Sequence, residues 1–211
     1  GIEEKMKKIL FIILISCFSL IIISCSEDKE ESTTDTVSTT SQMGGSIQGM
    51  ELSLSTAVTT LAGTGSSGSA NGTGTSASFN IPHAITTDGT NLYVADHDNH
   101  LIRQIVISTG VVTTVAGTGS SGSANGTGTS ASFNYPRGIT TDGTNLYVAD
   151  YSNHLIRKIV ISTGAVTTLA GTGSSGSANG TGTSASFNAP EGITTDETIL
   201  YVADTSNNLI R

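Results

Sequence analysis

The stretch that decides the fold is "NLYVADYSNHLIRKI", residues Asn145–Ile159. Almost the same string, "NLYVADHDNHLIRQI", starts at Asn91, and a shorter form, "ILYVADTSNNLIR", ends at Arg211. Three "FNxP" motifs, spaced 54 residues apart, begin at Phe79, Phe133 and Phe187. Self-similarity at a fixed period of this length is the signature of a repeat architecture, in which each repeat is one supersecondary unit that packs on its neighbours.

Each repeat contains four strand-like runs. In the second copy these are strand a, Gly138–Asp142; strand b, Asn145–Asp150; strand c, Leu155–Ser162; and strand d, Ala165–Gly171. All four are rich in β-branched residues and are bounded by turn signals such as Asp-Gly and Thr-Gly. Four short antiparallel strands followed by a Gly/Ser-rich crossover describe one blade of a β-propeller. The sequence therefore predicts an all-β protein.

The combined pattern "PxGIxxD … LYVADxxNHLIRKI … VTTLAG" resembles the NHL repeat, which is named for its Asn-His-Leu tripeptide. The tripeptide occurs here as Asn99-His100-Leu101 and Asn153-His154-Leu155, and the third copy departs from it with Asn207-Asn208-Leu209. The resemblance implies a β-propeller, usually of six blades. It also implies turn-forming hydrogen bonds by the aspartate of "VAD" and by the NHL box, here Asp96, Asn99, His100, Asp150, Asn153, His154, Asp204 and Asn207.

The propeller region is expected to cover residues 51–211. It begins with a lone strand d at 57–63, continues with repeats 79–132 and 133–186, and ends with a partial repeat at 187–211. Joining the lone strand to the partial repeat gives about three blades, whereas natural propellers have four to eight. Two interpretations stay open: the chain is a fragment of a longer six-bladed ring, or two chains form a six-bladed homodimer.

The N-terminus is predicted to be a lipoprotein signal peptide, residues 1–24, with 1–5 as an extension upstream of Met6. Lys7 and Lys8 precede an apolar run that is shorter than the roughly 20 residues of a membrane-spanning helix. "IISC" resembles a bacterial lipobox, which makes Cys25 the expected lipidation site. Cys17 stands in a similar "LISC", and an uncleaved anchor helix is the other alternative.

Residues 25–50 are polar and almost devoid of large apolar groups, which favours a flexible lipidated tether. A tether of this length spans on the order of 25–30 Å. We therefore expect a protein of the bacterial cell envelope, extracytoplasmic and held to a lipid bilayer through acylated Cys25.

Composition excludes several classes of function. The formal net charge is −8, and no cluster of Lys or Arg lies outside the signal segment, so nucleic-acid binding is not expected. Both cysteines lie in the signal segment, which leaves no disulfide framework. The motif "DHDNH" at Asp96–His100 contains Asp and His, which are common metal ligands. Only one copy carries both histidines, so we expect no metal and no cofactor.

The differences between the copies indicate where a ligand would bind. The two full copies differ at eight of 54 positions, and five of these lie at the start of strand a or in the b–c turn, which share one face. The candidate ligand face consists of His83, Arg137, Glu191, Tyr135, His97 and Tyr151. The competing interpretation is neutral drift at exposed loop positions.

The sequence thus predicts a binding or scaffolding module whose partner is a protein or a glycan. Catalysis needs unlike residues that converge from different blades, and the copies are nearly alike, so we expect no enzyme. The alternative is a propeller-type hydrolase or lyase, similar to the lactonases, whose catalytic blades lie outside this chain.

Overall fold

The computed structural model describes residues 56–211. The expectations for the signal peptide, for Cys25 and for the tether therefore fall outside the described residues. Within 56–211, none of the helices has the length and apolar character needed to cross a bilayer.

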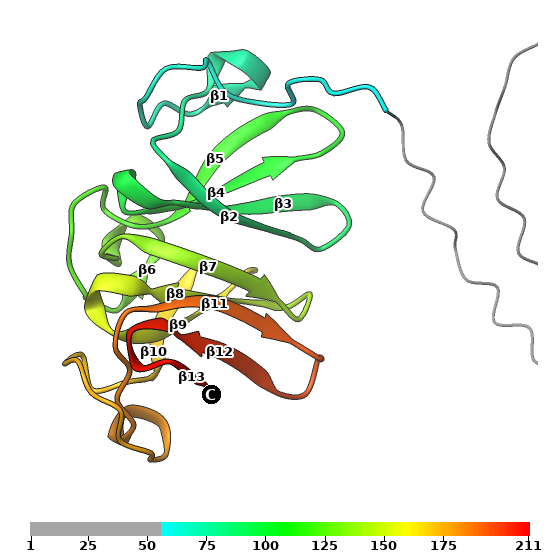
Figure 1. Ribbon diagram of the computed structural model, residues 1–211. Coiled ribbons are helices and arrows are strands. Elements are labelled where there is room, and N and C mark those ends of the chain that lie inside the picture. Colours follow the sequence, from blue (N-terminus) through cyan, green and yellow to red (C-terminus); the bar gives the residue numbers. More distant parts are fainter. Residues whose placement is uncertain (1–55) are drawn as a thin grey trace, which may run out of the picture. The chain divides into compact units, whose positions relative to one another are not determined.

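The described residues form three antiparallel sheets (Figure 1). The first, blade 1, has the order β1-β5-β4-β3-β2. Its strands are β1 Gly72–Thr73, β2 Pro82–Thr87, β3 Asn91–Asp96, β4 Leu101–Val106 and β5 Val111–Ala116.

Blade 2 repeats this order as β6-β10-β9-β8-β7, and blade 3 has the order β11-β12-β13. Blade 2 consists of β6 Gly126–Thr127, β7 Pro136–Thr141, β8 Asn145–Asp150, β9 Leu155–Val160 and β10 Ala165–Ala170. Blade 3 consists of β11 Pro190–Thr195, β12 Leu200–Asp204 and β13 Leu209–Ile210. Short 3-10 helices lie in the crossovers (η1 Gly74–Ser76, η3 Gly128–Ser130, η5 Gly182–Ser184) and in the b–c turns (η2 His97–Asn99, η4 Tyr151–Asn153, η6 Thr205–Asn207).

The all-β prediction is confirmed, and strands a to d of the second copy are β7 to β10. Strand b was placed without error, and the other boundaries differ by one or two residues. One strand was missed: the crossover contributes the two-residue strands β1 and β6, which pair with β5 and β10 at the outer edge of each sheet.

The prediction of a lone strand d at 57–63 was wrong, because these residues form no strand in the structure. A strand needs a hydrogen-bonded neighbour, and β5 and β10 find theirs in strand c of the same blade. Within the described residues, none of the strands pairs with 58–63. As a result Val58 is 98% exposed, whereas Val112 and Val166 at the equivalent positions are 1% and 2% exposed.

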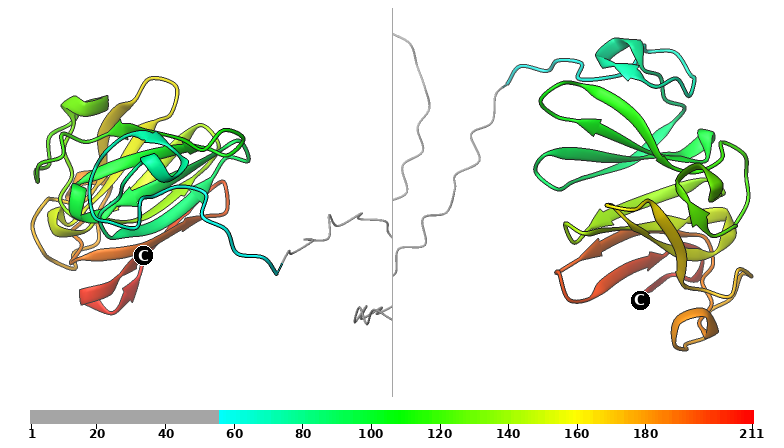
Figure 2. Two further views of the ribbon diagram at one scale, coloured as in Figure 1. Left: turned by 90° about the horizontal axis from the view of Figure 1, so that it is seen from above. Right: turned by 180° about the vertical axis from the view of Figure 1, so that it is seen from behind.

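The blades pack face to face in chain order, and the two further views in Figure 2 show the same succession. Each contact joins the back surface of one blade to the front surface of the next. Blade 1 contributes the back surface Ala95, Ile102 and Ala116, and blade 2 contributes the front surface Phe133, Ile139, Val148 and Ile159. The next contact uses the equivalent residues, Ala149, Ile156 and Ala170 against Phe187, Ile193 and Val202.

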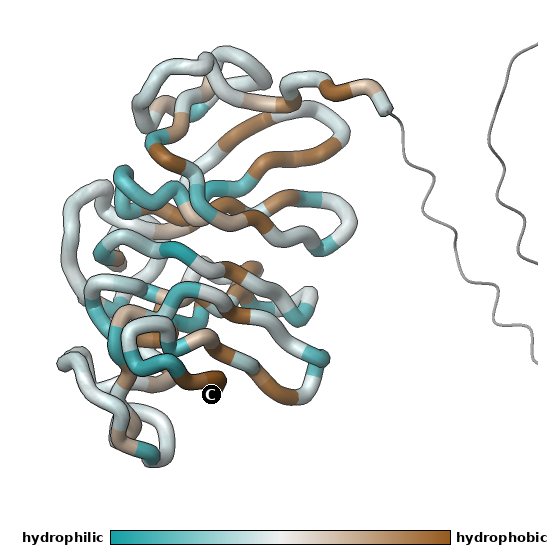
Figure 3. The backbone as a smooth tube through the Cα atoms, viewed as in Figure 1, coloured by the Kyte–Doolittle hydropathy of each residue, from teal (hydrophilic) through white to brown (hydrophobic). Residues whose placement is uncertain are grey.

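The apolar residues concentrate in the strands, and the long crossovers are nearly neutral in hydropathy (Figure 3). The innermost strands β2, β7 and β11 lie side by side. Their first residues are therefore brought together at one end of the blades. This end also carries the b–c turns η2, η4 and η6, and we call it the crossover face.

Candidate functional site

A buried ion pair stands behind the crossover face in each complete blade. In blade 2, Arg157 donates from Nη1 to Asp150 Oδ2 at 2.9 Å, and both side chains are fully buried. Asn153 also donates to Asp150, at 2.8 Å, and to the carbonyl of Gly122. Asp96, Asn99 and Arg103 repeat these contacts in blade 1. The pair fixes the b–c turn to the crossover that precedes it.

The third blade keeps the same contacts in looser form. Asn207 donates to Asp204 Oδ2 at 2.8 Å, and Arg211 Nη1 lies 3.6 Å from that carboxylate. All three aspartates are 0% exposed. Burial raises the pKa of Asp150. The hydrogen bonds from Asn134 and Asn153 and the charge of Arg157 lower it, but they do not cancel the effect of burial.

The histidines of the NHL box have a different role from the turn-forming one that the resemblance implied. His100 Nδ1 accepts a hydrogen bond from the backbone N–H of Tyr135 at 3.1 Å, and His154 Nδ1 accepts one from Ala189 at 3.0 Å. In each case the donor belongs to the next blade. These histidines therefore join neighbouring blades at the crossover face.

The six predicted ligand-face residues all lie on this face. His83, Arg137 and Glu191 stand at equivalent positions near the start of β2, β7 and β11. His97 and Tyr151 open the b–c turns η2 and η4. Tyr135 directly precedes β7.

Four rings form a row that crosses from blade 1 to blade 2. The ring centroids of His83 and His97 are 5.6 Å apart and stacked, and those of His97 and Tyr135 are 4.9 Å apart. Tyr135 then meets His100 edge-on at 4.6 Å. Tyr135 is 39% exposed and His83 is also exposed, so the row presents ring surface to solvent.

Arg137 connects this row to blade 3. Its guanidinium lies 3.6 Å from the ring centre of Tyr151, in a cation–π contact. It donates from Nη1 to the Glu191 carboxylate and approaches His97 Nε2 with Nε at 3.5 Å. The Glu191 and Arg137 side chains are about one third and one quarter exposed, respectively. The pair can therefore offer both donors and acceptors to a ligand.

The surroundings of His83 and His100 favour the neutral form of each imidazole. The pKa of His83 is lowered, first by burial and then by the positive charge of Arg137 and the proximity of His97. Burial also lowers the pKa of His100. A neutral imidazole carries one donor and one acceptor nitrogen. The cluster, which consists of His83, His97, His100, Tyr135, Arg137, Tyr151 and Glu191, is thus a largely aromatic surface with few charges.

The backbone at the edge of the cluster is strained. Ile81, Tyr135 and Ala189 occupy equivalent positions with φ of 51°, 54° and 52°. Residues other than Gly and Asn adopt this left-handed conformation at a cost of roughly 1–2 kcal/mol. These are also positions at which the copies differ.

Some residues of the site were missed by the reasoning from sequence. Asp98, whose carboxylate lies 2.6 Å from His97 Nδ1, orients that ring. The crossover also makes specific contacts: Asn71 and Asn125 accept hydrogen bonds from Arg103 and Arg157. Across residues 56–211 no three His, Cys, Asp or Glu side chains converge as metal ligands.

Comparisons with known proteins agree with this fold. Residues 133–159 match the family model of the NHL repeat. The chain is 38% identical over 98 residues to NHL repeat-containing protein 2 of Gallus gallus, covering 46% of this chain and 13% of that protein. It is 34% identical over 132 residues to the human protein of the same name, covering 57% and 18%. The chain thus spans less than a fifth of the length of these relatives.

Two solved structures have a similar fold. One is a protein of unknown function from Bacteroides thetaiotaomicron, with a TM-score of 0.53, 28% identity, and coverage of 57% of this chain and 31% of that chain. The other is an auxiliary nutrient binding protein from Bacteroides ovatus, with a TM-score of 0.51, 26% identity, and coverage of 58% and 34%. The fold is that of NHL-type β-propeller blades. The matches in sequence support the NHL-repeat family for this chain.

Proposed function

We propose that this chain is a lipid-anchored, extracytoplasmic NHL-type propeller that binds a glycan at the crossover face. The observation that carries the proposal is the cluster itself. Positions at which nearly identical copies differ meet in one connected set of rings and paired charges, drawn from three blades.

The strained backbone argues against neutral drift at these positions. Glycine would relieve the left-handed conformation, yet the three copies have Ile81, Tyr135 and Ala189 there. Strained residues persist where their surroundings or a function require them. Tyr135, one of these three residues, has an exposed ring that contacts the imidazoles of His97 and His100.

The chemistry of the cluster fits a sugar better than an anion. The positive charge of Arg137 is already paired with Glu191, and the lowered pKa of His83 leaves that ring neutral at pH 7. Exposed rings can lie against the C–H face of a sugar, while Arg137 and Glu191 can donate to and accept from its hydroxyl groups. The likeness to a nutrient binding protein is consistent with this ligand class.

Changing Arg137 to Ala should weaken glycan binding at least tenfold, because one hydrogen-bonding group is lost and the Tyr151 ring is no longer held. The measurement is binding of the detergent-solubilised full chain to an array of bacterial and host glycans, followed by titration of the glycans that bind. Lys158→Ala, on β9 and away from the cluster, is the matched control.

If Arg137→Ala and Tyr135→Ala each bind the glycan as tightly as the unaltered chain does, the glycan does not bind at the crossover face. Chromatography of the recovered glycan supplies a second result. A binding module releases the glycan unchanged, whereas a hydrolase or lyase would shorten it.

The membrane anchor has its own prediction. In a bacterial host fed an alkyne-tagged fatty acid, the chain should take up the tag, and Cys25→Ser should abolish the uptake. Cys17→Ser should leave it unchanged, because "IISC" at 22–25 is the proposed lipobox. Tagging that survives in Cys25→Ser and disappears in Cys17→Ser would move the lipidation site to Cys17.

A further inference from the structure

The hydrogen bond that joins blade 1 to Tyr135 requires a neutral imidazole. His100 follows the turn η2 in the left-handed conformation, and its Nδ1 accepts the backbone N–H of Tyr135 at 3.1 Å. A backbone amide nitrogen is a donor only, so Nδ1 carries the lone pair and the proton of the neutral ring is on Nε2. An imidazolium has a proton on both nitrogens. Protonated His100 therefore cannot make this contact.

Tyr135 depends on such contacts because its backbone is strained. Its φ is 54°, a conformation that is unfavourable for a residue with a large side chain. His100 holds its N–H, and its ring packs against His97 and His100 with centroid distances of 4.9 Å and 4.6 Å. A strained residue keeps its conformation only where its surroundings hold it. His100 thus holds both the backbone and the exposed ring of Tyr135 in the cluster.

The surroundings of His100 determine when it takes up a proton. Within the described residues these are Asp98 and His97 of the same turn and the Tyr135 ring of blade 2, while Arg137 on β7 contacts His97. Burial lowers the pKa of His100 most, Asp98 raises it and His97 lowers it. The Asp98 carboxylate lies 2.6 Å from His97 Nδ1. His100 is therefore neutral at pH 7 and becomes protonated only below about pH 6.5, the usual pKa of histidine.

The third copy has a side chain at this position that does not titrate. Asn208 takes the place of His100, with a φ of 56° against 54°. The asparagine amide has an acceptor oxygen at every pH, and asparagine adopts the left-handed conformation more readily than most residues. His100→Asn is therefore a change that the fold already contains, and it should keep the acceptor while it removes the titration.

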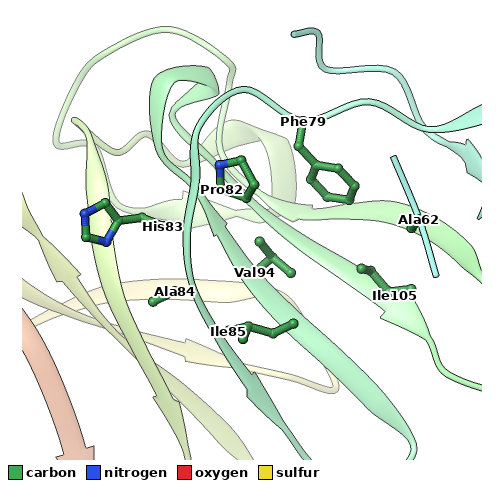
Figure 4. A pocket seen from close by; sticks show the side chains of 8 residues that line it. All are labelled: Ala62, Phe79, Pro82, His83, Ala84, Ile85, Val94 and Ile105. Atoms are coloured by element: carbon green, nitrogen blue, oxygen red, sulfur yellow. The ribbon is translucent and has the colours of Figure 1, made fainter. Parts of the chain in front are cut away.

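The other two histidines of the cluster act on Tyr135 less directly. His97 contacts the Tyr135 ring. His83 stacks on His97 at 5.6 Å, and it lines one side of a pocket on the front surface of blade 1, with its ring directed away from Phe79 (Figure 4). A proton on His83 therefore reaches Tyr135 through His97, whereas a proton on His100 removes the acceptor of the Tyr135 N–H.

We infer that His100 positions Tyr135 for the ligand of the crossover face and releases it when the imidazole is protonated. Given the glycan binding proposed above, on which this inference rests, the site binds its ligand near neutral pH and loses it in acidic surroundings. The ligand binds to molecules in which Tyr135 is held, so its apparent affinity falls with the fraction of neutral His100.

The first measurement needs no ligand. In ¹H–¹⁵N NMR spectra of the full chain in detergent, the Tyr135 amide signal should move between pH 7.5 and pH 5, because its acceptor is lost. In His100→Asn the same signal should stay in place. His154→Asn, the equivalent change at the junction of blades 2 and 3, is the matched control, and in it the Tyr135 signal should still move. A signal that does not move in the unaltered chain, or that moves equally in His100→Asn, would overturn the proposal.

The second measurement is the affinity for the glycan that the unaltered chain binds most tightly on the array. Its dissociation constant should rise by about threefold or more from pH 7.5 to pH 5, as the fraction of neutral His100 falls. His100→Asn should bind as tightly as the unaltered chain at pH 7.5 and show less than about half of this rise. His100→Ala lacks the acceptor at every pH and should bind weakly at both. An equal rise in His100→Asn would assign the pH dependence to another group and overturn the proposal.

The two measurements separate this proposal from the proposed function. If no glycan binds the unaltered chain at pH 7.5, the proposed function is wrong, and the Tyr135 signal alone decides whether His100 positions this residue. If a glycan binds and the Tyr135 signal moves while the affinity stays constant with pH, the ligand does not depend on Tyr135. The proposed function then stands, and the role of His100 in ligand binding is wrong.

Discussion

Replacing Arg157 by Ala should lower the free energy of unfolding by about 3–5 kcal/mol, because it leaves the carboxylate of Asp150 buried without its counter-charge. Arg157 and Asp150 are both 0% exposed. Arg157 also donates to two carbonyls and to Asn125 Oδ1, and its guanidinium lies over the Phe133 ring. The measurement is urea denaturation of the full chain in detergent, with Lys158→Ala as the control on the same strand.

The pH dependence identifies the cause. Burial already raises the pKa of Asp150 in the intact chain, and without Arg157 that pKa rises further. An acid whose pKa is raised on folding stabilises the folded state as the pH falls. The deficit of Arg157→Ala should therefore shrink from pH 7 to pH 5. A deficit that is constant over this range would mean that lost packing, and not the stranded charge, is responsible.

Replacing Phe133 by Ala should also cost about 3–5 kcal/mol, since the ring is 0% exposed and lies in the cluster between blades 1 and 2. Phe79→Ala is an internal control, because it removes the same ring from the equivalent position in the half-buried front surface of blade 1. Because less of the Phe79 ring is buried, its cost should be less than half as large. Equal costs for the two changes would mean that the Phe79 ring is as deeply buried as the Phe133 ring.

The strands of each blade could be predicted from the sequence because their β-branched runs and turn residues are local signals. The segment 57–63 shows the limit of such signals. Its sequence is nearly that of β5 and β10, but a strand forms only as one of a hydrogen-bonded pair, and none of the described strands pairs with 58–63. The opposite error was made for β1 and β6, which the sequence did not predict. The dipeptide Gly-Thr has no strand pattern, and it forms a strand only because β5 or β10 lies beside it.

The candidate site was predictable in its location but not in its contacts. Differences between copies fall on residues that share one face, and strand polarity alone fixes that face. The pairing of Arg137 with Glu191 joins residues 54 positions apart, and the hydrogen bond from Tyr135 to His100 joins residues 35 apart. Such contacts depend on how neighbouring blades pack, which a repeat pattern does not specify.

The most direct test of the account is a through-hydrogen-bond nitrogen–nitrogen coupling, measured by NMR on the ¹⁵N-labelled full chain in detergent. The account holds that each 54-residue repeat is a blade docked on the next, with the NHL histidine joining the two. It predicts a coupling between the Tyr135 amide and His100 Nδ1, and a second between the Ala189 amide and His154 Nδ1. The absence of both couplings would contradict the packing of the blades and the site built on it.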